Sequence, residues 1–263
     1  MSIPAQADLG ITLENHVATV EIRRPPHNFF DLDLIRQIAD TYEALDRTPA
    51  CRAILLCAEG KNFCAGANFG ASDAGNAKDS SQGALSNALY REAVRIFRCT
   101  KPVVAAVQGA AIGGGLGLAV SADFRVTCPE GRFSANFTKL GFHPGFGLTL
   151  TLPRLIGEQR AALLCLSSRR IDGEQAAAWG LADFCVPQAE LRATAQALAA
   201  EIAGCAPLAV MSTRATLRVG LADRIARQTD HELVEQNWLR TTSDWAEGIK
   251  ATAERREPVF TGS

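Results

Sequence analysis

The segment AIGGGLGLAV, residues 111–120, contains three consecutive glycines and a fourth glycine two positions later. An apolar run, Pro102–Val107, precedes it, and the residues after it have helical character. A strand, a glycine turn and a helix together expose backbone N–H groups at a helix N-terminus, where the helix dipole adds positive potential. Such a corner can bind a phosphate or stabilise an oxyanion during acyl transfer or enolate formation. The glycines alone are explained equally well by a tight packing turn.

A second segment, FCAGANF at residues 63–69, follows another apolar run, Ala53–Ala58. It also combines small residues with exposed N–H groups at the end of a strand. Two such corners, from successive strand–turn–helix units, could supply two donors to one oxygen. The known nucleotide motifs do not fit, because GGGLG departs from G-x-G-x-x-G and no G-K-[ST] follows it.

Composition narrows the class of protein. The chain has 263 residues, 47% hydrophobic and 21% charged, with a net charge of −1, which is typical of a globular protein without a basic field for nucleic acid or a membrane surface. The eight cysteines are dispersed, with no C-x-x-C pair, so neither a zinc site nor another metal site is expected. The N-terminus lacks the pattern of a secretory signal, and no apolar run is long enough to span a bilayer. We therefore expect free thiols and a cytoplasmic location.

Residue periodicity predicts the elements that would position these corners. Strands are expected at Ile11–Leu13, Val17–Ile22, Ala53–Ala58, Pro102–Val107, Phe124–Cys128, Arg132–Ser134 and Phe184–Val186. Helices are expected at Leu32–Leu45, Leu85–Phe97, from the glycines to Ser121, and at Leu148–Ser167, Gly173–Trp179, Glu190–Ala203, Pro207–Val219 and Arg224–Arg256. Glu59–Gln82 is expected to be a long loop. The pattern is that of an α/β chain of strand–strand–helix units followed by a helical tail.

Five segments, in order along nearly the whole chain, resemble those of the crotonase superfamily, also called the enoyl-CoA hydratase/isomerase family. They are FCAGANF (63–69), KPVVAAVQGAAIGGGLGLAVSADFRV (101–126), FSANFTKLGFHPGFGLTLTLPRLIG (133–157), DGEQAAAWGLADFCVP (172–187) and SDWAEGIKATAERREPVFTG (243–262). The resemblance implies an α/β fold, a crotonase-like superhelix of ββα units over residues 1–195. It also implies a C-terminal helical region, residues 196–263, that builds a homotrimer or a dimer of trimers.

The resemblance further implies a lyase or isomerase that acts on an acyl-CoA thioester. Coenzyme A would be part of the substrate, and no tightly bound cofactor is expected. By position, the backbone N–H groups of Ala67 and Gly114 would stabilise an enolate-type oxyanion. Ala65 and Gly113, which neighbour them, would contact the substrate.

Family hydratases add water with two glutamates, one acting as base and one as acid. The resemblance aligns these two positions with Gly117 and Phe137, and neither residue can transfer a proton. This replacement argues against ordinary two-glutamate hydration. Both residues are instead expected to line the substrate site, where the Phe137 ring would limit the range of acyl groups.

His143, in the segment LGFHPG, is a candidate catalytic residue. In the family this loop runs beside the thioester, and relatives without the glutamates, such as certain decarboxylases and dehalogenases, carry a catalytic polar residue there. A histidine can act as a base near neutral pH. A histidine hydrogen-bonded to the backbone before a proline is an equal alternative. The corresponding functions are an acyl-CoA decarboxylase or C–C hydrolase that uses His143, or a non-catalytic acyl-CoA-binding homologue.

Five further polar positions complete the expected substrate site. Asn68 is either a helix N-cap or a substrate contact, and Asn136 either orients a carbonyl or water or holds a turn. His27 and Asn28 fall where the family holds the adenine end of coenzyme A. Arg255 aligns with a tail lysine that approaches the coenzyme A phosphates of a neighbouring subunit, and a solvated helix face is its alternative.

Overall fold

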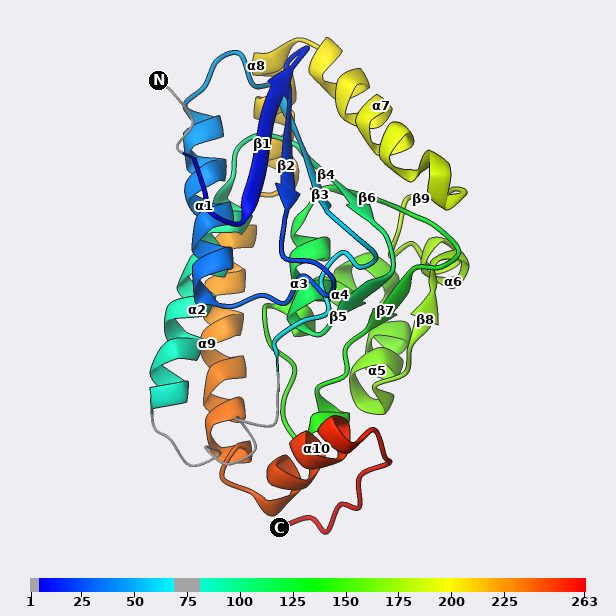
Figure 1. Cartoon of the computed structure of the whole chain (residues 1–263). Coiled ribbons are helices and arrows are strands. Elements are labelled where there is room, and N and C mark those ends of the chain that lie inside the picture. Colours follow the sequence, from blue (N-terminus) through cyan, green and yellow to red (C-terminus); the bar gives the residue numbers. More distant parts are fainter. Residues whose placement is uncertain (1–4, 69–80) are drawn as a thin grey trace.

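The computed structural model describes residues 5–68 and 81–263, the side chains of residues 81–86 excepted. A six-stranded sheet in the order β1-β2-β3-β4-β6-β9 forms its centre, beside a three-stranded sheet in the order β5-β7-β8 (Figure 1). The strands are β1 (Leu9–Glu14), β2 (Val17–Ile22), β3 (Ala53–Ala58), β4 (Val103–Val107), β5 (Ala110–Ile112), β6 (Phe124–Thr127), β7 (Arg132–Ser134), β8 (Ile171–Asp172) and β9 (Phe184–Cys185).

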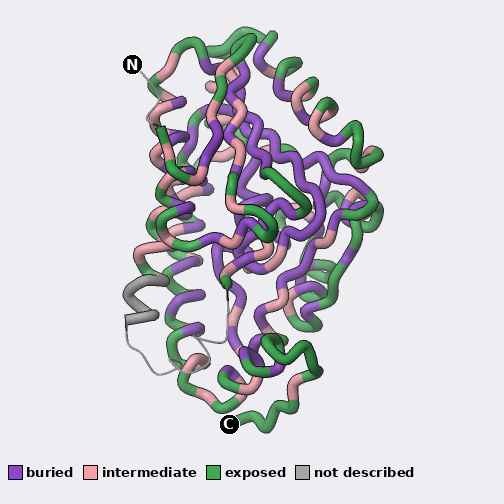
Figure 2. Tube along the Cα trace, in the orientation of Figure 1, coloured by how far each residue is buried: buried purple, intermediate pink, exposed green. Residues whose placement is uncertain are grey.

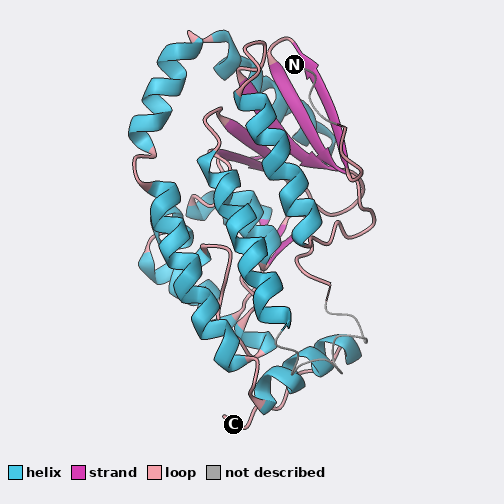
Figure 3. Cartoon of the chain, turned by 90° about the vertical axis from the view of Figure 1, so that its left-hand side faces the viewer, coloured by secondary structure: helices cyan, strands magenta, loops and turns pink. Residues whose placement is uncertain are grey.

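Helices cover both faces of the large sheet. They are α1 (Leu32–Asp46), α2 (Ser81–Arg98), α3 (Gly114–Ser121), α4 (Leu148–Ile156), α5 (Glu158–Ser167), α6 (Gly173–Trp179), α7 (Leu191–Gly204), α8 (Pro207–Leu217), α9 (Leu221–Leu239) and α10 (Ser243–Glu254), with 3-10 turns η2 (Thr138–Leu140) and η3 (Gln188–Glu190). Helices α1, α2 and α9 pack side by side, and Figure 3 shows long helices lying together in front of the strands. Helix α7 covers the opposite face.

Strand β3 is buried at every position because helices pack on both of its faces (Figure 2). Ile54 and Leu56 face the larger core, together with the apolar side of α1. The alternate residues Leu55 and Cys57 face α7, where Ala195 and other small residues allow close contact. Strands β2, β3, β4, β6 and β9 run parallel, and β1 joins β2 as an antiparallel hairpin.

The predicted alternation of two strands and a helix is confirmed, with two corrections to the helices. The helix predicted at Leu148–Ser167 is two helices, because Gly157 adopts a φ of +80° between α4 and α5. The helix predicted at Arg224–Arg256 ends at Leu239 and starts again after Thr242, whose side chain caps the N-terminus of α10. The short strands β5 and β8 were not predicted. Most of the expected loop Glu59–Gln82 lies outside the described residues, and α2 begins at Ser81.

The predicted boundary between residues 195 and 196 falls inside α7. This helix packs as one unit against the sheet through Leu191, Ala195, Ala199 and Ala203. In the part of the chain that the structure describes, no single helix has the length and apolar character to cross a membrane. One bent pair, Gln188–Gly204 with Pro207–Leu217, passes that test by length and composition, with a bend of 107°.

Asn28 ties the connection between β2 and α1 to the segment after β3. It is fully buried with a φ of +49°, and its Nδ2 donates to the carbonyl oxygens of Glu59 at 2.8 Å and Asn62 at 2.7 Å. Its Oδ1 accepts the N–H of Arg24 at 2.9 Å. The expectation that Asn28 contacts coenzyme A is therefore corrected, because its side chain is committed to the backbone.

Replacing Asn28 by alanine should destabilise the fold strongly. The substitution leaves two buried carbonyls and one N–H without partners, and it places alanine in the left-handed region, so we expect a loss of roughly 2–4 kcal/mol in the free energy of unfolding. Chemical denaturation would measure this loss. Asn237→Ala, at an exposed position of α9, is the control and should change stability by less than ~0.5 kcal/mol. A loss below ~0.5 kcal/mol for Asn28→Ala would show that the hydrogen bonds of its side chain do not stabilise the fold.

Candidate active site

Two segments that follow neighbouring strands lie hydrogen-bonded side by side. The N–H of Cys64 donates to the carbonyl of Ala110 at 2.8 Å, and the N–H of Ile112 donates to the carbonyl of Cys64 at 3.1 Å, which forms a parallel bridge between Cys64 and Ala111. Gly113 continues the contact by donating to the carbonyl of Ser134 at 2.8 Å. The two corners predicted from the sequence are therefore brought together.

Each corner presents a backbone N–H. Gly114 is the first residue of α3, whose N-cap, Gly113, has no side chain to occupy the free donors of the first turn. Among the described residues, no acceptor contacts the N–H of Ala67. Ala67 and Gly114, from different segments, both line the same cavity.

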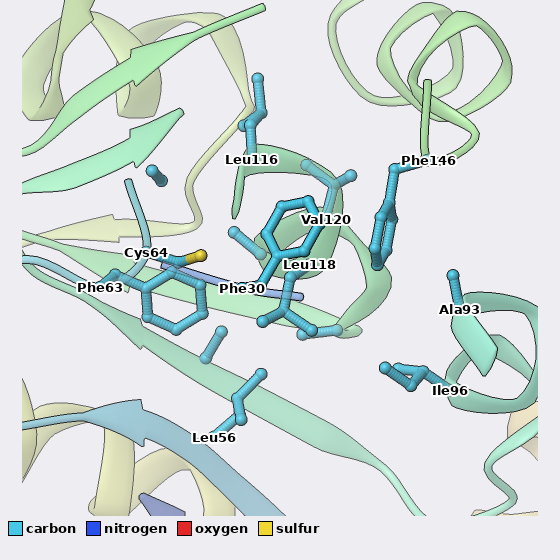
Figure 4. Packing of buried hydrophobic residues seen from close by; sticks show 14 of the residues in the cluster. Phe30, Leu56, Phe63, Cys64, Ala93, Ile96, Leu116, Leu118, Val120 and Phe146 are labelled. Carbon is cyan, nitrogen blue, oxygen red and sulfur yellow. The ribbon is translucent and has the colours of Figure 1, made fainter. Parts of the chain in front are cut away.

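The glycines are also required by packing. A Cβ added to Gly114 would lie 2.1 Å from Cζ of Phe30, and one added to Gly115 would lie 2.2 Å from the carbonyl oxygen of Cys64. Figure 4 shows Phe30 beside the helix that carries Leu116 and Leu118. These contacts account for a tight packing turn at the triple glycine, and its role as a donor corner stays a prediction.

The cavity has a volume of about 430 Å³, and most of its wall is apolar, with several aromatic rings. Its wall consists of Phe29, Phe30, Ala65, Gly66, Ala67, Asn68, Leu89, Tyr90, Ile112, Gly113, Gly114, Asn136, Phe137, Leu140, Phe142, Phe146, Gln236, Arg240, Trp245, Ile249 and Thr252. A second cavity of about 570 Å³ shares Phe29, Phe30, Ala67, Asn68 and Leu89 with it and adds Arg24, Asp31 and Leu32. The two cavities therefore adjoin at the Ala67 corner.

Helix α10 closes one side of the first cavity with Trp245, Ile249 and Thr252. It sits directly on η2, because a Cβ on Gly248 would be 2.5 Å from the carbonyl carbon of Leu140. The Phe142 and Trp245 rings meet edge to face, with centroids 4.6 Å apart.

Comparison with known proteins identifies the family. The model "Enoyl-CoA hydratase/isomerase" matches residues 12–263. The chain is 31% identical to 1,2-epoxyphenylacetyl-CoA isomerase of Escherichia coli, over 95% of this chain and 97% of that protein. It is 34% identical to a probable enoyl-CoA hydratase of Rhodobacter capsulatus, over 80% of this chain and 81% of that protein. The crystal structure of an enoyl-CoA hydratase/isomerase from Pseudoalteromonas atlantica superposes with a TM-score of 0.85 at 29% identity, covering 97% of this chain and all of the other.

The chain belongs to the enoyl-CoA hydratase/isomerase family. Its fold is the α/β crotonase fold with C-terminal helices, and the enzymes of this family act on acyl-CoA thioesters. The motif resemblance seen in the sequence is therefore confirmed at the level of family and fold.

Seven of the residues expected in this crotonase site do line the cavity. They are Ala65, Ala67, Asn68, Gly113, Gly114, Asn136 and Phe137. The Asn136 side chain is half-buried and lies beside Gly113, with its Oδ1 3.1 Å from where a Cβ of that glycine would be. Among the described residues no group hydrogen-bonds to the side-chain amide of Asn136, so this amide is available to a ligand.

Gly117 does not reach the cavity. It is buried, and the Phe146 side chain fills the space beside it, so that a Cβ on Gly117 would lie 2.6 Å from Cβ and Cδ1 of Phe146. The Phe146 ring also packs on Phe30, with centroids 5.9 Å apart (Figure 4). The expectation that Gly117 contacts the substrate is corrected: an aromatic side chain from another loop occupies that side of the cavity.

His143 is also not part of the cavity wall. Its Nδ1 lies 2.7 Å from the carbonyl oxygen of Pro144, and its own carbonyl accepts a hydrogen bond from Gln236 at 2.9 Å. The ring faces His231 of α9, with centroids 6.0 Å apart. This geometry favours the alternative of a histidine held to the backbone of its turn.

His27 and Arg255 are exposed and lie outside both cavities. The carbonyl of His27 accepts the N–H of Ala65 at 3.0 Å, so His27 supports the first corner through its backbone. Arg255 ends α10 with a φ of +55°. Their expected contacts with coenzyme A remain predictions.

The sequence analysis did not assign the polar side chains contributed by α2 and α9, which are Tyr90, Gln236 and Arg240. Gln236 and Arg240 are four residues apart, which places them on one face of a helix. That spacing was the available signal, but only the fold shows that this face borders the cavity. We call Tyr90, Gln236 and Arg240 the polar wall.

The polar groups available in the cavity are amides, the Tyr90 phenol, the Thr252 hydroxyl, the Trp245 indole and a guanidinium. Among the described residues of its wall there is no carboxylate, histidine or cysteine. Cys64 lies just behind the first corner, and burial raises the pKa of its thiol to about 12, which disfavours the thiolate needed for nucleophilic attack. Across the described residues no cluster of three or more His, Cys, Asp or Glu side chains could hold a metal ion.

Glu232 anchors the loop that carries Phe146. It is fully buried on α9, and its carboxylate accepts hydrogen bonds from the N–H of Gly147 at 2.8 Å and from the N–H and hydroxyl of Thr149 at 3.1 and 2.5 Å. These donors belong to the N-terminal turn of α4, where a negative charge is favoured by the helix dipole. Burial nevertheless raises the pKa of the Glu232 carboxyl from 4.5 to about 7.

The raised pKa predicts a dependence of stability on pH. The folded protein keeps the Glu232 proton up to about pH 7, whereas the unfolded chain loses it near pH 4.5, so the contribution to stability is full below that value and is lost as the pH rises through 7. Relative to Glu232→Gln, the wild type should lose up to ~3 kcal/mol of unfolding free energy between about pH 5 and pH 8. Glu235→Gln should follow the wild type. If the unfolding free energies of the wild type and of Glu232→Gln changed in parallel with pH, the raised pKa of Glu232 would be refuted.

The contact between Gly117 and Phe146 predicts a compensating pair of substitutions. Gly117→Ala forces a Cβ into the Phe146 side chain and should cost about 1–3 kcal/mol. In the background of Phe146→Gly, which removes both the Cβ and the ring, the same substitution should cost far less, and denaturation of the four proteins would measure the coupling. Gly204→Ala, which has no heavy atom within 4 Å of its added Cβ, is the control. Equal costs in both backgrounds would exclude the contact as the cause.

Proposed function

We propose that this enzyme binds an acyl-CoA thioester with its acyl group in the 430 Å³ cavity and stabilises an enolate-type oxyanion with the backbone N–H groups of Ala67 and Gly114. One observation carries the proposal: two amide donors, on segments that are hydrogen-bonded to each other, line a single cavity. The names of the relatives, an epoxyacyl-CoA isomerase and a probable hydratase, support a thioester substrate.

The reaction follows from the groups that the wall provides. Gly117 and Phe137 stand at the positions that align with the two family glutamates. None of the described residues of the wall carries a carboxylate. We propose a step that forms the enolate without a carboxylate base, either loss of CO₂ from the α-carbon or cleavage of a carbon–carbon bond to it. In the first case the bonding electron pair stays on the α-carbon and spreads to the thioester oxygen, CO₂ leaves, and a solvent proton later restores the α-carbon. In the second case water adds to the carbonyl attached to the α-carbon, the bond between them breaks with its electron pair on the α-carbon, and the other fragment leaves as a carboxylic acid.

Coenzyme A itself would run from the Ala67 corner into the second cavity. Asn68 borders both cavities, and Arg24 lies in the second cavity, where it pairs with Asp8 and Asp31 at 2.7 and 2.8 Å. Arg255 would meet the phosphates of a neighbouring subunit in a homotrimer. The exposed apolar side chains of α8 and the turn after it support an assembly, because Leu208, Leu217 and Val219 are 81%, 74% and 76% exposed in the single chain.

The test is mass spectrometry of a panel of acyl-CoA thioesters incubated with the protein in deuterated water. We expect deuterium at the α-carbon or a product lighter by CO₂, with little hydration of crotonyl-CoA. Gly114→Ala should reduce this turnover by at least ~10-fold, because its Cβ collides with Phe30 beside the donor. Gly204→Ala is the matched control and should keep full turnover.

Two results would reject parts of the proposal. Binding of thioesters without any exchange or product would favour a non-catalytic acyl-CoA-binding protein. His143→Ala should retain most of the turnover, since its ring is held at the Pro144 carbonyl and lies off the wall. A complete loss in that variant, with the fold intact, would restore His143 as the catalytic base.

A further inference from the structure

Asn136 follows strand β7 in the same way that Gly114 follows strand β5. The two strands run parallel, with Ile112 opposite Ser134, and the N–H of Gly113 extends the pairing by donating to the carbonyl of Ser134 at 2.8 Å. Gly114 and Asn136 each lie two residues beyond the paired position, at the same end of the small sheet. Hydrogen bonds between strands therefore set the position of Asn136 relative to the first turn of α3.

The side chain of Asn136 borders the space next to the Gly114 donor. Its Oδ1 lies 3.1 Å, and Cζ of Phe137 lies 3.7 Å, from the position that a Cβ on Gly113 would occupy. Asn136, Phe137 and Gly114 all line the same cavity. A thioester whose oxygen accepts from Gly114 would therefore bring the substituents of its α-carbon toward an amide and an aromatic ring.

The Asn136 amide is half-buried and has no hydrogen-bond partner among the described residues. The polar wall differs, because the Tyr90 hydroxyl donates to Oε1 of Gln236 at 2.9 Å, and Nε2 of Gln236 donates to the carbonyl of His143 at 2.9 Å. Arg240 also donates to Oε1 of Gln236, at 3.3 Å. The polar wall is thus engaged within the protein, whereas the Asn136 amide can hold a polar group of the substrate.

On the basis of the proposed function, we propose that the substrate is a 2-carboxyacyl-CoA thioester and that Asn136 holds the carboxylate that leaves as CO₂. The amide N–H donates to a carboxylate oxygen while the thioester oxygen faces Ala67 and Gly114. The bond between the α-carbon and the carboxylate breaks, its electron pair passes through the α-carbon to the thioester oxygen, and CO₂ leaves. A solvent proton then adds to the α-carbon as the enolate returns to a thioester.

A neutral amide suits a carboxylate that must give up its charge. The negative charge moves to the thioester oxygen as the bond breaks, so a group that stabilised the carboxylate strongly, as a cation does, would oppose the reaction. An amide orients the carboxylate with a weaker hydrogen bond. The Phe137 ring beside it supplies no donor to replace the water that the carboxylate loses, which raises the energy of the carboxylate before the bond breaks.

Cleavage of a carbon–carbon bond by water has less support from the wall. That reaction needs a group that activates water, and the described residues of the wall include no carboxylate, histidine or cysteine. Loss of CO₂ needs no base in the step that breaks the bond. The Asn136 amide and the two backbone donors are sufficient for it.

Release of CO₂ from CoA thioesters by the purified protein tests this inference, with the products identified by mass spectrometry. The panel contains malonyl-CoA, 2-butylmalonyl-CoA, the neutral analogue 3-oxobutanoyl-CoA, and succinyl-CoA, whose second carboxylate lies one carbon further from the thioester. We expect CO₂ from the malonyl thioesters and none from succinyl-CoA, because only a carboxylate on the α-carbon leaves its electron pair next to the thioester carbonyl.

Two substitutions test the role of Asn136. Asn136→Ala should lower kcat/KM for CO₂ release by ~10- to 100-fold, as expected for the loss of a hydrogen bond to a charged group. Asn136→Asp keeps the shape of the side chain and should lower it at least as much, because its carboxylate repels that of the substrate. Both variants should bind 3-oxobutanoyl-CoA as the wild type does. Asn237→Ala, at an exposed position of α9, is the control and should keep the full rate.

The outcomes separate this inference from the proposed function. Release of CO₂ at the wild-type rate by Asn136→Ala or by Asn136→Asp would overturn the role of Asn136. Cleavage of 3-oxobutanoyl-CoA, with no CO₂ from either malonyl thioester, would overturn this inference and leave the enolate chemistry of the proposed function standing. No binding of any thioester would overturn both. If Asn136→Ala does not fold, Asn136→Asp alone decides the role of the amide.

Discussion

The parallel bridge between Cys64 and Ala111 is the contact on which the candidate site depends. Strands β3 and β4 are neighbours in the large sheet, and the segments that leave them turn in the same direction and pair again in the second layer. This second pairing sets the register of Ala67 against the start of α3. Two donors that are far apart in the sequence thereby become fixed by ladder hydrogen bonds instead of by loop conformation, which is how a site gains orientation before its ligand arrives.

The replacements around the donors form a consistent set. Phe146 fills the volume beside Gly117, and Phe137 packs on Phe142 with ring centroids 5.2 Å apart. Of the two positions aligned with the family glutamates, one is Gly117, which the Phe146 side chain covers, and the other is Phe137, itself an aromatic residue. The described part of this surrounding holds aromatic rings and no carboxylate, and such a surrounding has a low dielectric, which strengthens the interaction of backbone dipoles with a developing negative charge.

Most of the strands, the helical layers and the glycine corners followed from the sequence, because periodicity and turn residues are local signals. The errors have physical reasons. Strands β5 and β8 are short and are defined by their partners more than by their own residues. Tyr90 and Gln236 are 146 positions apart, so their hydrogen bond has no local signature. For His143, the sequence left a catalytic role and a structural role open, because the orientation of its ring depends on Pro144 and α9, which sequence spacing does not report.

Helix α10 gives the cavity a late completion during synthesis. The donors at Ala67 and Gly114 and the sheet that holds them are translated well before Trp245, Ile249 and Thr252, which supply the final wall. Without those residues, the corner formed by Ala67 and Gly114 would be an open trough. The seat of α10 on η2 through Gly248 closes one side of that trough, so the cavity is completed only when α10 has folded onto residues that are translated far earlier.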